Sequence, residues 1–248
     1  MIEVEDLHKS FNGLEVLRGA SFHAVKGELL ALIGRSGYGK SVLLKHVPGL
    51  IRPDRGRVLI DGNDLSISRG KKLEALRSRF GFVFQNGALF DSMTVFENVA
   101  FPLKEKTKLS DHEIKKRVLS ILDEVGLSNA ENKYPAQISG GMVRRAALAR
   151  SLVRNPEIML FDEPTTGLDP IIGHAILNLI GSCHRRFKFT GILVTHEIPR
   201  AFEVVQKVAM LHEGKILIIA SPQEILSSTD PVVQQFVNGN IEGPIQYH

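Results

Sequence analysis

Residues 34–41 read Gly-Arg-Ser-Gly-Tyr-Gly-Lys-Ser, and this stretch constrains the fold more than any other. It matches the pattern G-x-x-x-x-G-K-[ST] and follows a continuous apolar run from Leu29 to Ile33. A helical stretch from Val42 to Val47 comes directly after it. Glycines let such a loop curl tightly, so its backbone N–H groups can converge on a phosphate. Strand, loop and helix in this order predict a P-loop, whereas a glycine-rich loop without function would not require that context.

The helix after this loop would point its positive end at the same anion. Lys40 is placed to reach β- and γ-phosphates, and Ser41 is placed to supply an oxygen to Mg²⁺. Tyr38 is bulky for such a loop, so we expect its ring to point outward, and Val42 offers only its backbone N–H. The predicted phosphate-binding residues are Gly34, Arg35, Ser36, Gly37, Tyr38, Gly39, Lys40, Ser41 and Val42.

The composition is that of a globular chain in a reducing compartment. Of the 248 residues, 43% are hydrophobic and 23% are charged, which argues against disorder. The net charge of +4 comes from basic residues scattered along the chain, so it is a weak argument for nucleic acid and suits acidic lipid or nucleotide equally. The single cysteine excludes an internal disulfide. No apolar run approaches the ~20 residues of a membrane span, and no signal-peptide pattern opens the sequence. We therefore expect a cytosolic protein, for which any membrane role would need partner subunits.

Short apolar runs alternate with helical patterns, which predicts an α/β fold. Runs at 29–33, 158–161 and 192–195 are continuously apolar, as strands of a parallel sheet covered on both faces must be. The first ~25 residues resemble a small β-rich edge. Residues 86–155 form a mostly helical insertion between core segments 1–85 and 156–237.

Two helices within the insertion have recognisable limits. One begins at Ser110, which forms a capping-box pair with Glu113, and stops at Gly126. The other runs from about Gly141 to Arg154. Beyond the insertion and the second core segment, a short amphipathic helix follows Pro231. We expect an extended C-terminal extension over 238–248, with a frayed terminus as the alternative.

An acidic pair follows the apolar strand at residue 158. Asp162 is placed to hold Mg²⁺, directly or through water. Glu163 is placed to act as general base on an attacking water, a role that contributes about 10²–10⁴-fold in rate. An acidic strand end without chemistry is the alternative, and the P-loop weighs against it.

A second anion site is predicted at Ser139, Gly140 and Gly141, which precede a helix of small and basic residues. One chain cannot easily bring this turn onto the γ-phosphate held by its own P-loop. A two-fold pair can, because each copy then offers its turn to the other. Taken alone, the turn would be an ordinary glycine-rich helix start.

These segments, in this order, resemble the ATP-binding cassette family over nearly the whole chain. The resemblance implies a P-loop NTPase (RecA-like) core with a mainly parallel sheet, an N-terminal antiparallel β subdomain and an inserted α-helical subdomain. It implies ATP and Mg²⁺ as ligands. Ser139, Gly140 and Gly141 would be the signature turn that contacts the partner's ATP. Met142 departs from the usual glutamine there, but the backbone of the turn is intact.

The same resemblance assigns four further residues. Gln85 would touch Mg²⁺ or water and sense the γ-phosphate, and His196 would contact that phosphate. Asp169, in Gly167-Leu168-Asp169, would lie at the dimer seam. Phe11 would stack on adenine. Taken singly, Phe11 suits the core and His196 suits a strand-end cap.

The type of cassette follows from length and local sequence. Ser139 comes 54 residues after Gln85 (139 − 85), which leaves no room for the long coiled-coil insertion of DNA-repair cassettes. Residues 41–46, 87–99, 138–150 and 235–239 together resemble the ATPase of Mla/Mce-type lipid transporters. That resemblance implies a homodimer on the inner face of the cytoplasmic membrane, with an integral membrane permease, an Mce-type lipid-binding subunit and no nucleic acid. A transporter ATPase for another solute, such as an amino acid, and a cassette that remodels nucleic acid remain alternatives.

The segment Leu89 to Phe101 is where such a cassette would present a groove to its permease. Leu89 and Phe90 are candidate apolar contacts. The other interpretation is that they only pack the helical insertion, and the sequence favours neither.

Overall fold

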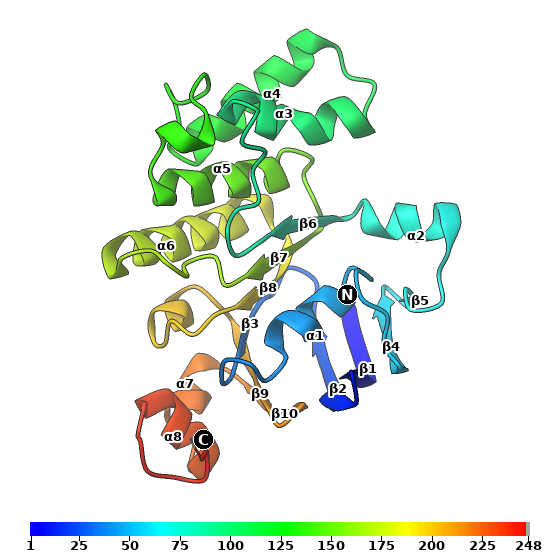
Figure 1. The fold of residues 1–248 in the computed structure, drawn as a ribbon, viewed down its shortest axis with the longest axis vertical. Helices are drawn as coiled ribbons and strands as arrows, with labels where there is room; N and C mark the ends of the chain where they lie inside the picture. The colour runs from blue at the N-terminus through cyan, green and yellow to red at the C-terminus, as the bar shows by residue number, and fades with distance from the viewer. Residues whose placement is uncertain (247–248) are drawn as a thin grey trace. The chain divides into compact units, whose positions relative to one another are not determined.

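The computed structural model, drawn in Figure 1, describes residues 1–246. The chain divides into two compact units. Unit 1 comprises Met1–Ser78 and Phe189–His248, and unit 2 comprises Arg79–Lys188. The predicted helical insertion, residues 86–155, lies within unit 2, and its boundaries as a domain stay a prediction. The last two residues of the predicted extension 238–248 lie outside the described residues.

Unit 1 contains an antiparallel sheet, which confirms the predicted β-rich edge. Its strand order is β2-β1-β4-β5. At the start of β1, Ile2 and Val4 are buried and Glu3 between them is exposed, as expected of a sheet with one covered face. The strands are β1 (Ile2–Phe11), β2 (Leu14–Ala24), β4 (Arg55–Ile60) and β5 (Asn63–Asp64).

Unit 1 also carries four strands in the order β10-β9-β3-β8, of which β9, β3 and β8 are parallel. Leu30 of β3 pairs with Ile192 of β8 on one side and with Lys207 of β9 on the other. Every residue of β3 and β8 is buried, as the continuous apolar runs predicted. The strands are β3 (Leu29–Ile33), β8 (Thr190–Val194), β9 (Lys207–His212) and the antiparallel edge strand β10 (Lys215–Ala220).

The helices of unit 1 are short. The first begins at Lys40, two residues before the predicted Val42, because Gly39 adopts a left-handed φ of 93° and turns the chain early. The helical elements are α1 (Lys40–His46), α2 (Gly70–Arg77), η2 (Arg200–Glu203), α7 (Pro222–Leu226) and α8 (Pro231–Asn238).

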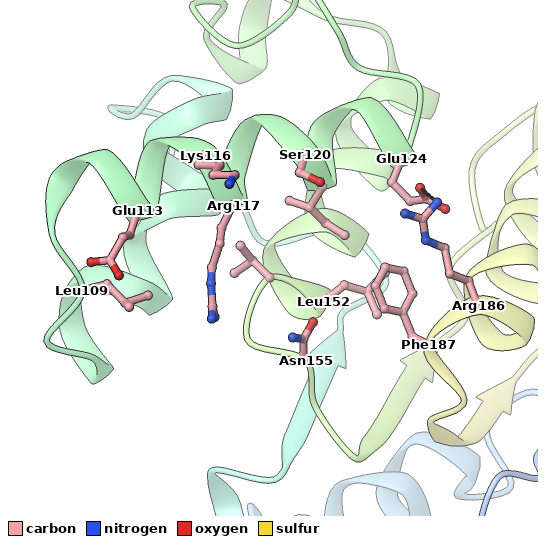
Figure 2. A pocket seen from close by; sticks show the side chains of 12 residues that line it. Leu109, Glu113, Lys116, Arg117, Ser120, Glu124, Leu152, Asn155, Arg186 and Phe187 are labelled. Atoms are coloured by element: carbon pink, nitrogen blue, oxygen red, sulfur yellow. Dashed lines mark ion pairs between the residues drawn. The ribbon is translucent and has the colours of Figure 1, made fainter.

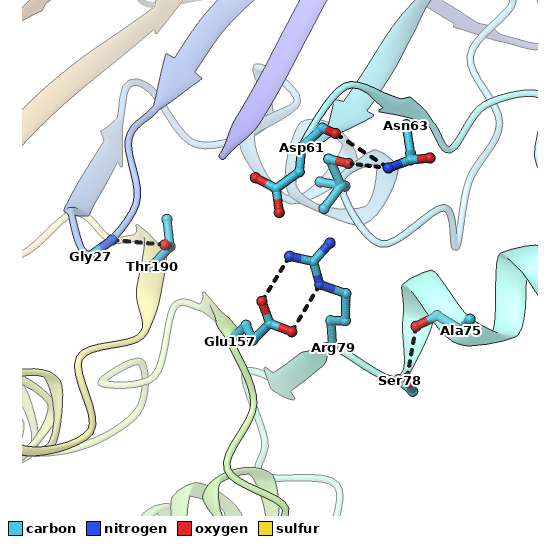
Figure 3. Close-up of polar contacts among 9 residues, drawn as sticks. Gly27, Asp61, Asn63, Ala75, Ser78, Arg79, Glu157 and Thr190 are labelled. Atoms are coloured by element: carbon cyan, nitrogen blue, oxygen red, sulfur yellow. Dashed lines mark hydrogen bonds and ion pairs between the residues drawn. The ribbon is translucent and has the colours of Figure 1, made fainter.

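Unit 2 contains the parallel pair β6 (Phe80–Val83) and β7 (Ile158–Asp162). Arg79 lies just before β6, and Glu157 lies just before β7. The Arg79 guanidinium donates two hydrogen bonds of 3.1 and 2.8 Å to the Glu157 carboxylate (Figure 3). The N–H groups of Glu157 and Ile158 both donate to the Arg79 carbonyl. A bidentate pair of this kind fixes the register at the start of the strands, so that both end at the same edge.

The helices of unit 2 confirm the predicted helical insertion. Ser110 and Glu113 form the expected capping box, and the helix they begin ends before Gly126, whose φ is 67°. The helix predicted over 141–154 begins one residue earlier and ends two residues earlier. The elements are α3 (Val95–Lys106), α4 (Asp111–Glu124), η1 (Pro135–Gln137), α5 (Gly140–Leu152) and α6 (Pro170–Phe187).

The C-terminal segment folds back on α8 instead of extending. Gln235 of α8 is 3% exposed, and its side-chain oxygen accepts from the Ile245 N–H at 2.6 Å. Its side-chain nitrogen donates to the Ile245 carbonyl at 3.1 Å, and Ile245 is itself buried. The short helix after Pro231 is confirmed, but the expected extended tail is wrong for residues up to 246, because one buried glutamine fixes the returning backbone.

Within residues 1–246, no helix is both long enough and apolar enough to cross a membrane.

Candidate functional site

At two glycines of the P-loop in unit 1, Gly34 and Gly39, any side chain would displace a neighbouring residue. Gly34 follows β3 with a φ of 140°, and a Cβ built there would lie 2.2 Å from the Leu211 carbonyl oxygen. Gly39 has a φ of 93°, and its Cβ would lie 2.6 Å from Val16 Cγ1. The loop is therefore a tight turn held against β9 and β2, and the absence of side chains at its glycines lets the backbone approach a ligand directly.

Lys40 directs its ammonium group into this turn. The side chain is 4% exposed, and Nζ donates to the carbonyls of Gly34 at 2.8 Å and Arg35 at 3.0 Å. A buried ammonium that is held by loop carbonyls is a positive charge placed at the floor of the turn. Phosphate oxygens are the ligands that such a charge and such a loop suit.

Arg35 and Tyr38 belong to a cluster on the side of the loop. Arg35 Nη1 donates to the Tyr38 hydroxyl at 3.1 Å and to the Gln246 carbonyl at 2.7 Å. The Tyr38 ring lies 6.1 Å from the His212 ring and is half-buried. The ring therefore turns to the side of the loop, against Arg35 and His212, instead of pointing freely into solvent.

A cavity of about 260 Å³ adjoins the loop within unit 1. β2 contributes both apolar and charged residues to it, and the β9–β10 turn contributes two further residues. The lining residues are Leu14, Glu15, Val16, Arg18, Gly37, Tyr38, Glu213 and Gly214. Such a mixed surface next to a phosphate loop can receive the remainder of a nucleotide.

Phe11 and His196 are both exposed in unit 1. Phe11 ends β1 with 42% of its surface exposed, and the Lys9 ammonium lies 5.3 Å from its ring. Phe11 is therefore not a core residue. His196 lies two residues beyond β8 and is exposed, whereas the neighbouring Thr195 is buried and its hydroxyl accepts from the Glu197 N–H at 3.0 Å.

The acidic pair of unit 2 sits where β7 ends. Asp162, the last residue of β7, is 6% exposed. Glu163 follows with a left-handed φ of 47°, a conformation that costs a non-glycine residue about 1–3 kcal/mol and often marks functional positions. The Thr166 hydroxyl donates to Glu163 Oε2 at 2.9 Å. The carboxylate of the predicted base thus has a defined orientation.

The signature turn of unit 2 starts α5. The Ser139 hydroxyl caps the helix by accepting from the Met142 N–H at 3.3 Å, and both Ser139 and Gly140 are exposed. A Cβ on Gly140 would lie 3.2 Å from Leu168 Cδ2, and one on Gly141 would lie 2.7 Å from Ile172 Cγ2. The turn is therefore packed closely on one side and open on the other.

Asp169 and Gln85 complete the predicted residues of unit 2. The Asp169 carboxylate caps α6 by accepting from the N–H groups of Ile171 and Ile172, each at 3.0 Å. Gln85 lies two residues beyond β6 and is exposed. The predicted site residues are thus divided between the two units, and the roles they share across them stay predictions.

Two residues that sequence reasoning missed lie beside these motifs. Arg144 of α5 is 9% exposed, and burial lowers the pKa of its guanidinium. Its Nη2 donates to the Thr166 carbonyl at 3.1 Å, and the Thr166 hydroxyl in turn contacts Glu163. The sequence shows only that Arg144 is a basic residue one turn into the helix that follows the predicted anion site. That position does not reveal the contact with Thr166.

The residues fit ATP and Mg²⁺. Side chains at Gly34 and Gly39 would meet Leu211 and Val16, and Lys40 already points at the loop interior. Within residues 1–246, no group of three or more His, Cys, Asp or Glu forms a metal cage. Mg²⁺ is commonly bound through one or two protein oxygens together with substrate phosphates. The hydroxyl of Ser41 in unit 1 and the carboxylate of Asp162 in unit 2 are each oxygen ligands of that kind.

A separate cavity of about 420 Å³ lies on unit 2 away from these motifs (Figure 2). Arg186 and Glu124 point toward each other across one end and form an ion pair. None of the predicted site residues lines this cavity. Its lining residues are Leu109, Glu113, Lys116, Arg117, Ser120, Ile121, Glu124, Leu152, Val153, Asn155, Arg186 and Phe187.

Several known proteins are similar to this chain in sequence or in fold. The ABC transporter family matches residues 17–166. The probable ribonucleotide transport ATP-binding protein mkl of Mycobacterium leprae is 44% identical over 244 residues, which are 98% of this chain and 70% of that protein. The intermembrane phospholipid transport system ATP-binding protein MlaF of Haemophilus influenzae is 36% identical, over all of this chain and 94% of its own length.

A solved structure agrees with the fold. The dimeric post-hydrolysis state of the ATP-binding cassette MJ0796, bound to ADP and Pi, superposes with a TM-score of 0.82 at 31% identity and covers 90% of this chain and 99% of that one. The predicted P-loop NTPase fold is therefore confirmed. With the P-loop, the acidic strand end and the signature turn all present, the chain belongs to the ABC transporter family and is an ATP-binding, ATP-hydrolysing cassette of it.

Proposed function

We propose that this cassette powers phospholipid transport as one of two identical ATPase subunits beneath a membrane permease. The similarity to MlaF supports this function, because it extends over the whole of this chain and 94% of the relative. The protein mkl, whose name refers to ribonucleotide transport, is matched over only 70% of its length. An intermembrane lipid system would also supply an Mce-type lipid-binding subunit and would place the cassette on the inner face of the cytoplasmic membrane.

In the proposed mechanism, Lys40 and the loop Gly34–Ser41 bind the β- and γ-phosphates of ATP, and Phe11 stacks on adenine. The signature turn of the second copy covers the same γ-phosphate. Each composite site thus needs both chains, and ADP, which lacks the γ-phosphate, favours the closed pair less than ATP does. The open side of the signature turn, where Ser139 and Gly140 are exposed, supports this arrangement.

The other predicted site residues act in the hydrolysis step. Glu163 accepts a proton from the attacking water, and His196 stabilises the γ-phosphate as it leaves. Ser41, Gln85 and Asp162 would hold Mg²⁺, which neutralises phosphate charge when bound. The hydrogen bond from Thr166 supports the assignment of Glu163, because a general base must be oriented before it can act.

A second cavity of unit 2 supports the permease contact. It measures about 360 Å³, and five of its eleven lining residues are phenylalanines. Phe90 is 43% exposed and packs edge-on against Phe101, with ring centroids 5.1 Å apart, while Phe84 is 36% exposed and stacks on Phe82. Phe90 therefore both packs the helical segment and leaves apolar surface for a partner, so the two interpretations of this segment are compatible.

Purification of the tagged chain from its native membrane, followed by reconstitution in phospholipid vesicles, tests the proposal. We expect a multi-span protein and an Mce-domain protein to copurify, bound phospholipid to appear by mass spectrometry, and ATP hydrolysis to move labelled phospholipid. Replacement of Phe90 by Asp should release the permease, whereas the same change at the exposed Leu119 of α4 should not. Stimulation by ribonucleotides with no effect of phospholipid would contradict the proposal.

A further inference from the structure

The signature turn and the segment that follows Glu163 form one tightly packed joint within unit 2. A Cβ on Gly140 would lie 3.2 Å from Leu168 Cδ2, and one on Gly141 would lie 2.7 Å from Ile172 Cγ2. Protein interiors this dense transmit small displacements instead of absorbing them. A shift of the signature turn must therefore move the segment 165–169 or be resisted by it.

Arg144 adds a polar link to this joint. It lies one turn into α5 and is 9% exposed. Nη2 donates to the Thr166 carbonyl at 3.1 Å, and Nε has no hydrogen-bond partner among the described residues. A guanidinium removed from water is costly unless its partners are fixed, so the bond to Thr166 holds the joint in one geometry.

Thr166 connects that link to the catalytic carboxylate. Its carbonyl accepts from Arg144, and its hydroxyl donates to Glu163 Oε2 at 2.9 Å. Glu163 sits at a left-handed φ of 47°, where an isolated glutamate would not rest, so surrounding contacts must hold it there. One residue thus carries hydrogen bonds from the signature helix and to the base.

We infer that Arg144 is a positioning residue which, through Thr166, couples the signature turn of each chain to Glu163 of the same chain. The inference rests on the proposed function, in which the signature turn contacts ATP held by the other copy. Contact of the signature turn with ATP bound by the partner then fixes the orientation of Glu163 in the same chain. That Glu163 acts on the ATP in the other site of the pair. Arg144 thereby links the two ATP sites through a path of three residues inside one polypeptide.

Two substitutions break the path at different points. Arg144→Met keeps an unbranched apolar stem and removes the donor to the carbonyl. Thr166→Val keeps the shape of the side chain and removes only the hydroxyl bonded to Glu163. Neither change touches the P-loop, so binding of ATP to the loop of the same chain should not depend on them.

The experiment measures kcat and KM for ATP in the purified full-length protein. Each variant should lower kcat about tenfold while KM and nucleotide affinity stay within about twofold, because a positioning bond acts on the chemical step. Thr166→Ser, which restores the hydroxyl, should recover most of kcat. Arg117→Met, the same change at an exposed position of α4, should match the wild type.

The double variant Arg144→Met/Thr166→Val separates a path from two unrelated defects. Residues in one network are not additive, so the double variant should also lose about tenfold rather than about a hundredfold. Three results would overturn the inference. They are an unaltered kcat in Thr166→Val, a rise in KM as large as the fall in kcat, and a kcat in the double variant that falls by the product of the two single losses. If Arg144→Met does not fold, as thermal unfolding would show, Thr166→Val and its serine counterpart still decide. A wild type without ATPase activity overturns the proposed function as well, whereas an active wild type with unchanged variants overturns only the path.

Discussion

The P-loop and the signature turn both place glycines before a helix, but they use them differently. Gly34 and Gly39 adopt left-handed conformations and approach another part of the chain so closely that a Cβ would meet Leu211 or Val16. Gly140 and Gly141 have ordinary φ values and are limited only by side chains, Leu168 and Ile172. The first turn is a closed cradle whose glycines press against their own chain, and the second is open to solvent at Ser139 and Gly140.

Lys40→Ala should have the largest effect, because it removes the buried charge inside the closed cradle. We expect loss of both ATP binding and turnover, measured by titration with a fluorescent ATP analogue and by phosphate release. Lys45→Ala, on the same helix, should retain both. Tight ATP binding by Lys40→Ala would show that the cradle does not depend on this charge.

Glu163→Gln should lower turnover by about 10²–10⁴-fold and leave ATP binding intact, because an amide cannot accept the proton from water. ATP should then hold the pair closed, so light scattering should show an ATP-dependent rise in mass. Glu105→Gln, exposed on α3, is the matched control. An unaltered hydrolysis rate would remove Glu163 from its assigned role.

Ser139→Arg should block closure of the pair by filling the open side of the signature turn. ATP binding to the separate chain should remain within about twofold of wild type, while hydrolysis falls to the level of an unpaired chain. Ser120→Arg, exposed on α4, introduces the same bulk elsewhere. Full ATPase activity in Ser139→Arg would contradict a site shared between two chains.

Alanine substitutions of the glycines test how closely each turn is packed, through the free energy of unfolding. Gly34→Ala should cost more than about 2 kcal/mol in the free energy of unfolding, since it combines backbone strain with a clash against a carbonyl. Gly37→Ala, with φ 82° and no atom within 4 Å of the new Cβ, should cost only about 1 kcal/mol. Equal losses at the two positions, measured by denaturant unfolding, would show that close approach to Leu211 is not what requires Gly34.

Gly141→Ala should have the smallest effect on stability, a loss of no more than about 1 kcal/mol. Crowding against Ile172 is partly offset by the better helix propensity of alanine at the start of α5. Calorimetry would measure it. A loss as large as that of Gly34→Ala would mean that the signature turn is as closed as the P-loop.

Local signals in the sequence were sufficient for much of the fold. The apolar runs at β3, β7 and β8 and the capping box at Ser110 each act over a few residues, so they are readable without tertiary contacts. The P-loop and the acidic pair were found for the same reason. The exact role of Gly34 was not, because Leu211 lies far along the chain.

Contacts between distant segments were not predictable. The return of the tail depends on Gln235 being buried with both amide atoms used by Ile245, which composition does not indicate. The link from Arg144 to Glu163 depends on a backbone carbonyl, whose position follows from the packing of α5. Residue type identifies candidates for chemistry, but the network that orients them is a property of the folded chain.

A structure of the Glu163→Gln variant with ATP and Mg²⁺ tests the shared site most directly. We expect two copies in which the γ-phosphate contacts Lys40 of one chain and both the partner's Ser139 and the partner's Gly141. A triphosphate enclosed by one copy alone, with both signature turns facing solvent, would contradict it.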